Sequence, residues 1–220
     1  MAKKSLEERI QRLEDIREIQ NLMSRYEYLH TAGLQDETAE LFAKKTPGVR
    51  AEIANWGVYE GIEGIRRLYP GFHKYLEGNP AGQMFMHALT TSVIEVAGDG
   101  KTAKGVWISP GHETIRDPEG KPQAMWTWIK YGNDFVKEDG KWKIWHLHVY
   151  GIFHTPYGKS WVEVSGEIPF EISVPVPDEL KPDRPTTHPL WWYRPTVAPE
   201  NVPAPPEPYE TWDESTAYVK

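Results

Sequence analysis

The chain has 220 residues, of which 39% are hydrophobic and 26% charged, and its formal net charge at pH 7 is -7. These are ordinary values for a globular protein, and the acidic balance argues against a nucleic-acid surface. Without cysteine the chain can form neither disulfides nor thiolate metal sites. No apolar run is long enough to span a bilayer or to act as a secretory signal, so we expect a cytoplasmic protein without a membrane partner.

The first third of the chain is predicted to be mainly helical. Residues 5–33 carry apolar side chains every three or four positions, which is typical of an amphipathic helix. Ser5 and Glu8 fit a capping box at its start. The further elements expected in this part are a short helix at 35–44, a hairpin at 49–60, and a helix at 62–78 that Pro70 and Gly71 kink or split.

From residue 83 the pattern changes to strands rich in Val, Ile, Thr and aromatic residues. Turn sequences containing glycine separate these strands, which predicts an antiparallel meander. Helices followed by a run of strands indicate an α+β fold. The expected strands are 83–97, 101–116, 122–138 and 141–154.

After residue 155 the composition changes. Of the 19 prolines, 13 lie in residues 156–220, and residues 203–208 form a polyproline-type stretch. A disordered tail would lack large apolar side chains, whereas this segment keeps Trp161, Phe170, Leu190, Trp191, Trp192, Tyr193, Tyr209 and Trp212. We therefore expect a domain at 1–155 and an extended arm at 156–220 that wraps the domain or a partner subunit; a free, linker-like tail is the alternative.

Three short motifs follow one another along this order of elements. Ile19-Gln20-Asn21-Leu22 with Ser24-Arg25-Tyr26 lies in the first helix, Gly57-Val58-Tyr59-Glu60-Gly61 leaves the hairpin, and Asp139-Gly140-Lys141-Trp142-Lys143-Ile144 enters the last strand. In order and spacing they resemble the SnoaL-like members of the nuclear transport factor 2-like superfamily, over about residues 5–155. The resemblance implies a cone-shaped fold, in which N-terminal helices close a curved antiparallel sheet around one pocket.

The resemblance also implies a class of chemistry. Members include cofactor-free dehydratases, isomerases, dehydrochlorinases and epoxide hydrolases, which transfer protons in a dry pocket. They commonly place a histidine where this chain has His87, and imidazole can take and return a proton near neutral pH. The aspartate that usually orients this histidine is replaced here by Thr31, beside His30. The resemblance therefore implies a different set of donors and acceptors around His87.

Two further residues are candidates for proton transfer with His87. Tyr26 lies one helical turn before His30, and His112 follows a Ser-Pro-Gly break that could redirect its side chain. Each of these residues could instead be a hydrogen-bonded core residue. The predicted substrate-binding residues are Trp107, Trp128, Tyr131, His30 and Thr31. Trp107 and Ser109 share one strand face, and Trp126 and Trp128 share another face opposite Thr127 and Tyr131, but the sequence leaves open which face lines the pocket.

His146 and His148 share one strand face and could form a metal pair. No carboxylate follows them at the spacing of a cupin-type site, so we predict no metal and assign both residues to an interface between copies of the chain. A homodimer or homotrimer is expected, because the sheet face and the arm would otherwise expose apolar surface.

Three functions of different class fit these features. The first is a cofactor-independent lyase that removes a hydroxyl, with or without formaldehyde, from a hydroxylated aromatic substrate; the superfamily includes lignin-derived diarylpropane (γ-formaldehyde) lyases. The second is a dehydratase or isomerase of a steroid- or polyketide-like substrate. The third is a binding or scaffold domain without catalysis. The sequence has no Gly-x-Gly-x-x-Gly motif and no phosphate-binding loop, and ten tryptophans suit a pocket for a flat ligand, which favours an enzyme without a cofactor.

Overall fold

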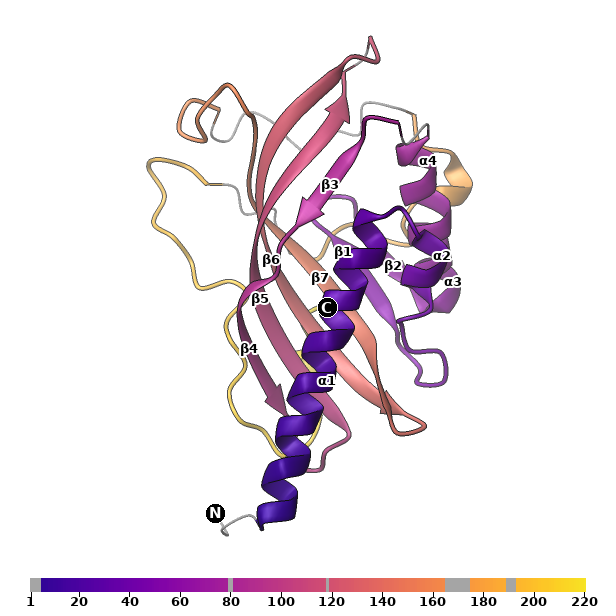
Figure 1. Ribbon diagram of the computed structural model, residues 1–220, viewed down its shortest axis with the longest axis vertical. Helices are drawn as coiled ribbons and strands as arrows, with labels where there is room; N and C mark the ends of the chain where they lie inside the picture. The colour runs from indigo at the N-terminus through magenta and orange to yellow at the C-terminus, as the bar shows by residue number, and fades with distance from the viewer. Residues whose placement is uncertain (1–4, 79–80, 118, 165–174, 189–192) are drawn as a thin grey trace.

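A computed structural model describes residues 5–78, 81–117, 119–164, 175–188 and 193–220 of the chain (Figure 1). Helix α1 (Leu6–Thr31) begins at the predicted capping box, in which the Ser5 hydroxyl and the Glu8 side chain each accept from the other residue's backbone N–H. Its C-terminal half packs on the sheet through Ile19 and Met23, which are fully buried. The N-terminal end of α1 extends past the sheet, and Leu6 is exposed there. Ile10 and Leu13 of the predicted apolar stripe are exposed as well.

The segments after α1 form the second side of the fold. Pro70 lies inside a π-helical segment. Proline has no backbone N–H to donate, and the helix continues through this position in the π form. The elements are α2 (Gln35–Ala39), β1 (Arg50–Ile53), β2 (Val58–Glu60), α3 (Gly61–Arg66), η1 (Arg67–His73) and α4 (Lys74–Glu77). The predicted helix 62–78 is therefore one continuous run of three helical pieces.

The remaining strands build a seven-stranded sheet with the order β2-β1-β7-β6-β5-β3, and β4 also pairs with β5. The predicted strand 83–97 is in fact two strands. The bounds are β3 (Met84–His87), β4 (Thr90–Val96), β5 (Thr102–Arg116), β6 (Pro122–Glu138) and β7 (Lys141–Pro156). The α+β cone is confirmed, but the sheet is mixed rather than wholly antiparallel, because β1 runs parallel to β7.

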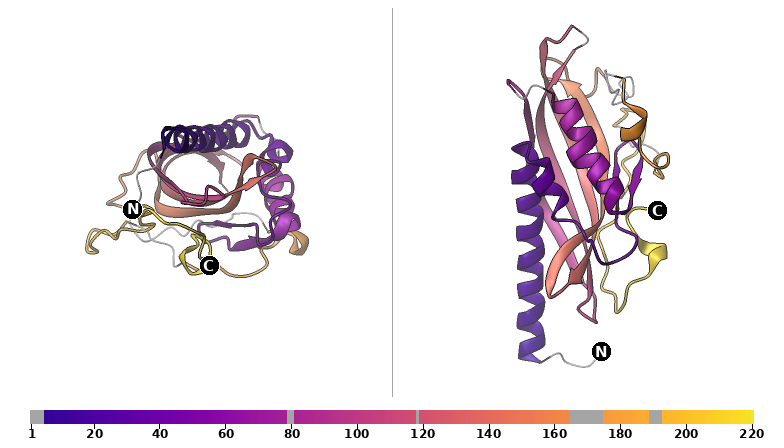
Figure 2. Two further views of the ribbon diagram at one scale, coloured as in Figure 1. Left: turned by 90° about the horizontal axis from the view of Figure 1, so that it is seen from below. Right: turned by 90° about the vertical axis from the view of Figure 1, so that its right-hand side faces the viewer.

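Figure 2 shows the curved sheet along the long axis of the molecule, with α1 on one side and the yellow C-terminal segment on the opposite side. The inner face, toward α1 and η1, holds the apolar core, which includes Phe42, Leu68 and Phe135. One inward position depends on glycine: a Cβ on Gly105 would lie 2.5 Å from Cη2 of Trp107, two residues along the same strand. Gly105 therefore makes room for the indole ring of Trp107.

The segment after residue 156 contacts the outer face of its own sheet. Short 3-10 turns lie at η2 (Asp178–Leu180) and η3 (Glu214–Thr216). The buried Glu52 carboxylate accepts hydrogen bonds from the hydroxyls of Thr186 and Thr187 and from two backbone N–H groups. Phe170, Leu190, Trp191 and Trp192 lie outside the described residues, and the boundary at 155 remains a prediction.

Candidate functional site

The inner face of the sheet is set by the strand register. Trp107 pairs with Tyr131, Gly111 with Thr127, and Thr127 in turn with His154 of β7. Because paired residues point to the same side of a sheet, Trp107, Ser109, Glu113 and Tyr131 face α1, while Trp126 and Trp128 face outward. This settles the choice between strand faces that the sequence leaves open.

His87 lies at the centre of the inner site. It ends β3 opposite Gly111, and Nε2 of His87 lies 3.3 Å from Oε1 of Glu113. A Cβ on Gly111 would be 2.6 Å from Nδ1 of His87, so the bare backbone at Gly111 is what allows the imidazole to lie over β5. His154 reaches the other oxygen of Glu113 from β7, with Nε2 at 3.0 Å from Oε2.

The charges of this group follow from burial and pairing. Burial opposes ionisation of Glu113, but hydrogen bonds from His154 and His87 outweigh it and lower the pKa of Glu113 to about 2. Burial alone would lower the pKa of His87; the hydrogen bond and charge of Glu113, with a smaller contribution from Glu27, raise it instead. Glu113 therefore favours the protonated imidazolium form of His87.

A second carboxyl, Glu27, approaches the same space from α1. Burial raises its pKa to about 7, against the positive charge of His87 and the nearby Tyr131 hydroxyl, which both lower it. Neither Glu27 oxygen has a well-formed hydrogen bond. Glu27 is therefore close to half-ionised near neutral pH, which suits a group that must accept and return a proton.

Aromatic side chains form the wall between α1 and η1. The Tyr26 and Tyr69 hydroxyls are 2.9 Å apart, and the Tyr26 ring contacts Tyr131 edge to face. Burial raises the pKa of Tyr26 and of Tyr131 well above the ordinary value, so both remain protonated. His30 stacks on Tyr26 and meets His73 edge to face, and burial lowers the pKa of His30 to about 4.

Several buried polar atoms around this space have no hydrogen-bond partner among the described residues. Such atoms are uncommon in native proteins, because each costs about 1–3 kcal/mol. The atoms are both carboxylate oxygens of Glu27, Nδ1 of His87, Nε2 of His73 and Oγ of Ser109. They are the groups that a polar ligand could satisfy.

Five of the eight residues predicted for the site lie on this inner wall: His87, Tyr26, Trp107, Tyr131 and His30. The other three do not. His112 faces outward and packs against Trp126, with ring centroids 4.6 Å apart and the rings tilted by 50°. Trp128 is also on the outer face, 38% exposed, and Thr31 is exposed at the end of α1.

Neither carboxylate of the site was predicted from the sequence. Glu27 lies four residues after Met23 on the buried stripe of α1, and Glu113 stands two residues after Gly111 within an aromatic strand. A charged residue at a core position was the available signal. The acidic residue of α1 whose charge acts on His87 is Glu27, four residues before Thr31.

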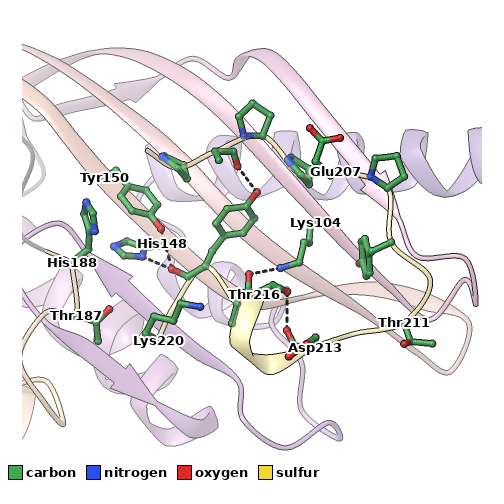
Figure 3. Close-up of a pocket in the computed structure, with 18 residues that line it drawn as sticks. Lys104, His148, Tyr150, Thr187, His188, Glu207, Thr211, Asp213, Thr216 and Lys220 are labelled. Carbon is green, nitrogen blue, oxygen red and sulfur yellow. Dashed lines mark hydrogen bonds between the residues drawn. The ribbon is translucent and has the colours of Figure 1, made fainter. Parts of the chain in front are cut away.

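The outer face carries a different polar cluster, around a cavity of about 480 Å³ beneath the C-terminal segment (Figure 3). Here polar groups are paired: His148 Nδ1 and the Tyr150 hydroxyl donate to the Tyr218 carbonyl, and Lys104 binds Asp134 and the Thr216 carbonyl. His146 is held by Asp134. His146 and His148 thus contact partners within their own chain, not the copy-to-copy interface expected from the sequence.

No group of three or more His, Asp or Glu side chains in the described part of the chain is arranged to hold a metal ion. In the same residues, no helix is both long and apolar enough to cross a bilayer.

Comparison with solved structures gives the same fold at low sequence identity. A hexachlorocyclohexane dehydrochlorinase, LinA-type3 from Novosphingobium barchaimii, matches with a TM-score of 0.57 and 18% identity over 69% of this chain and 95% of its own. A proposed scytalone dehydratase from Novosphingobium aromaticivorans matches with a TM-score of 0.53 and 19% identity, over 67% of this chain and 91% of its own. A proposed dehydratase of the nuclear transport factor 2-like family from Streptomyces avermitilis has a TM-score of 0.53 at 15% identity, over 64% and 99%.

No protein of curated function matches the sequence at a significant level. The family model described as "SnoaL-like domain", however, matches residues 11–148, which run from α1 through the first half of β7. That span includes His87, Glu27 and Glu113. The chain belongs to the SnoaL-like family.

Proposed function

We propose that this protein is a cofactor-independent lyase that eliminates a hydroxyl group from a small hydroxylated aromatic substrate inside the cone. The observation that carries the proposal is a buried His87–Glu113 pair that faces a second carboxyl, Glu27, with a pKa about 7. A proton-transfer elimination requires an acid and a base held close together away from bulk water.

His87 is the proposed general acid. Its Nε2 is held by Glu113, and its Nδ1 has no partner among the described residues, so Nδ1 is the nitrogen available to a substrate hydroxyl. Glu27 is the proposed general base. Tyr26 and Tyr131 are proposed hydrogen-bond donors, and Trp107 contributes to the apolar wall on which a ring could lie.

For a para-hydroxylated benzylic alcohol, the proposed first step is loss of water. Glu27 takes the phenolic proton, His87 donates a proton to the benzylic hydroxyl, and the C–O bond breaks to release water. The electron pair of the C–O bond leaves with the water, and the phenolate oxygen supplies the pair that forms the exocyclic double bond of a quinone methide. A phenolic substrate thus needs no external electron acceptor.

A hydroxymethyl group on the adjacent carbon allows one more step. Neutral His87 removes the proton of that hydroxyl, the C–C bond breaks, and formaldehyde leaves while the electron pair restores the aromatic ring. Glu27 returns its proton to the phenolate oxygen. The sum is a diarylpropanediol converted to a diaryl alkene, water and formaldehyde, with both residues back in their starting states.

A specific observation also favours the shorter reaction. The similar structures include proposed dehydratases, and a dehydrochlorinase likewise performs an elimination by name. Loss of water alone, from an aromatic, steroid-like or polyketide-like alcohol, uses the same acid and base and stops before the C–C bond breaks. A scaffold role without a ligand inside the cone has less support, because it leaves the unpartnered polar atoms of the inner wall unexplained.

Mass spectrometry with aldehyde trapping tests the proposal. Metal-stripped protein is incubated with phenolic diarylpropanediols and hydroxysteroids. Alkene with one equivalent of formaldehyde supports the carbon-releasing lyase, and a product lighter by water alone supports the dehydratase. His87→Gln should lower kcat/KM by on the order of 100-fold or more, while the matched change His112→Gln on the outer face should alter it by less than about twofold. Equal losses in the two variants would refute the assignment of the inner site.

A further inference from the structure

Glu113 carries one imidazole on each of its two oxygens. His87 approaches Oε1 from β3 at 3.3 Å, and His154 approaches Oε2 from β7 at 3.0 Å. The three side chains are 10%, 4% and 5% exposed for His87, Glu113 and His154. The carboxylate is thus held between two ring nitrogens in a space that excludes most water.

The register of four strands produces this arrangement. His87 pairs with Gly111, Gly111 with Thr127, and Thr127 with His154, so the two histidines end one row across the sheet. In the middle of the row, Nδ1 of His87 and Cγ2 of Thr127 fill the place above Gly111, at 2.6 and 2.7 Å from where a Cβ would lie. Glu113, two residues beyond Gly111 on the same face, reaches both histidines.

We propose that His154 is a positioning residue for the elimination: by donating to Oε2 of Glu113, it fixes the carboxylate so that Oε1 holds His87 in the orientation needed for proton transfer. This inference rests on the proposed function. His154 itself does not contact the substrate in this proposal; it acts on His87 through Glu113.

The effect has a definite sign. A carboxylate that loses one of two hydrogen-bond donors becomes a stronger acceptor for the donor that remains. Without His154, Glu113 would hold the His87 proton more tightly, so His87 would titrate at higher pH and would be a weaker acid toward a leaving hydroxyl.

The other groups that face His87 stay in place when His154 is changed. They are Glu27 and His30 from α1 and His73 from η1, which interact with it through charge. A change in the titration of His87 after substitution of His154 can therefore be assigned to Glu113.

Two variants separate positioning from packing. His154→Leu removes the donor, whereas His154→Gln keeps an N–H close to the place of Nε2. We expect His154→Leu to lower kcat by about 10-fold or more and to raise the pH at which His87 titrates by about half a unit or more. His154→Gln should restore both to within about threefold and a few tenths of a unit.

The His87 titration is followed by NMR on the free protein, with its ring signal identified by its absence in His87→Gln. This readout needs no substrate. If the native protein converts no substrate, the proposed function fails before any variant is compared. If the native protein is active but His154→Leu leaves the His87 titration unchanged, or if the Leu and Gln variants lose activity equally, the positioning role of His154 is refuted.

Discussion

Replacing Glu27 by Gln should make the protein more stable at alkaline pH while removing its activity. Burial in the folded state raises the pKa of Glu27 from its ordinary value of 4.5 to about 7. A group whose pKa is raised by folding stabilises the protein below its unfolded pKa, and this contribution is lost as pH rises through the folded pKa. Above pH 7 the native protein therefore carries an unfavourable buried charge that the neutral amide of the Glu27→Gln variant would not have.

The size of the effect follows from the two pKa values. A difference of roughly 2.5 units corresponds to about 3 kcal/mol once Glu27 is ionised in both states, near pH 8. At pH 5 the same relation gives less than about 1 kcal/mol, since the folded state keeps its proton. For a chain of this length, the gain at pH 8 amounts to a rise in Tm of roughly 6–12 °C.

Urea unfolding followed by tryptophan fluorescence at pH 5 and pH 8 measures this difference. Glu18→Gln is the matched control, because Glu18 lies on the exposed face of the same helix and should change stability by less than about 0.5 kcal/mol at either pH. If Glu27→Gln destabilises the protein at pH 8, Glu27 is a structural core residue with a satisfied charge, and its proposed role as the base loses its support.

Three other predictions concern separate parts of the fold. Gly111→Ala places a Cβ 2.6 Å from Nδ1 of His87 and should lower kcat by about 10-fold or more. Gly158→Ala is the control, because Gly158 has open space around it, and it should leave kcat unchanged. Equal activity in the two variants would show that the position of His87 does not depend on glycine at residue 111. Glu52→Gln weakens the charge-assisted hydrogen bonds to residues 186–188 and should destabilise the protein by about 2–4 kcal/mol, with faster cleavage in the arm under limited proteolysis; an unchanged urea midpoint would contradict this. Light scattering should find a dimer or trimer, since Trp128, Tyr157 and Trp161 leave apolar rings exposed on the outer side; a monomer at micromolar concentration would contradict the expected oligomer.

Much of the architecture could be predicted because local signals agreed with one another. The capping box at Ser5 fixed the start of α1, and glycine turns fixed the ends of the three long strands. The break between β3 and β4 had no such signal. It depends on which part of β5 each segment meets, and that pairing is a tertiary choice.

The site was harder to predict than the fold, for a physical reason. A strand pattern shows which side chains share a face but not which face is covered by a helix, so Trp107 and Trp128 looked equivalent until α1 was in place. His87 could be predicted because it occupies the strand position at which the resembled family commonly has a histidine. Glu113 was overlooked because a lone glutamate in a strand is usually a solvated edge residue, and its partner His154 lies 41 positions further along the chain.

The two faces of the sheet explain why one buried polar cluster is proposed as a site and the other is not. On the outer face, Asp134 is fully buried but binds Lys104, His146 and the Tyr218 backbone N–H, so its charge is satisfied within the chain. On the inner face, Glu27 is buried without a well-formed hydrogen bond, close to the charge of His87. A polar network whose hydrogen bonds are all formed adds rigidity to the fold. A buried network with unpaired groups destabilises the folded state, and folding by itself does not explain why such groups are kept. In the proposed function, polar groups of the substrate form the hydrogen bonds that the inner cluster lacks. A bound substrate analogue that donates a hydrogen bond to Glu27 should therefore lower the pKa of Glu27.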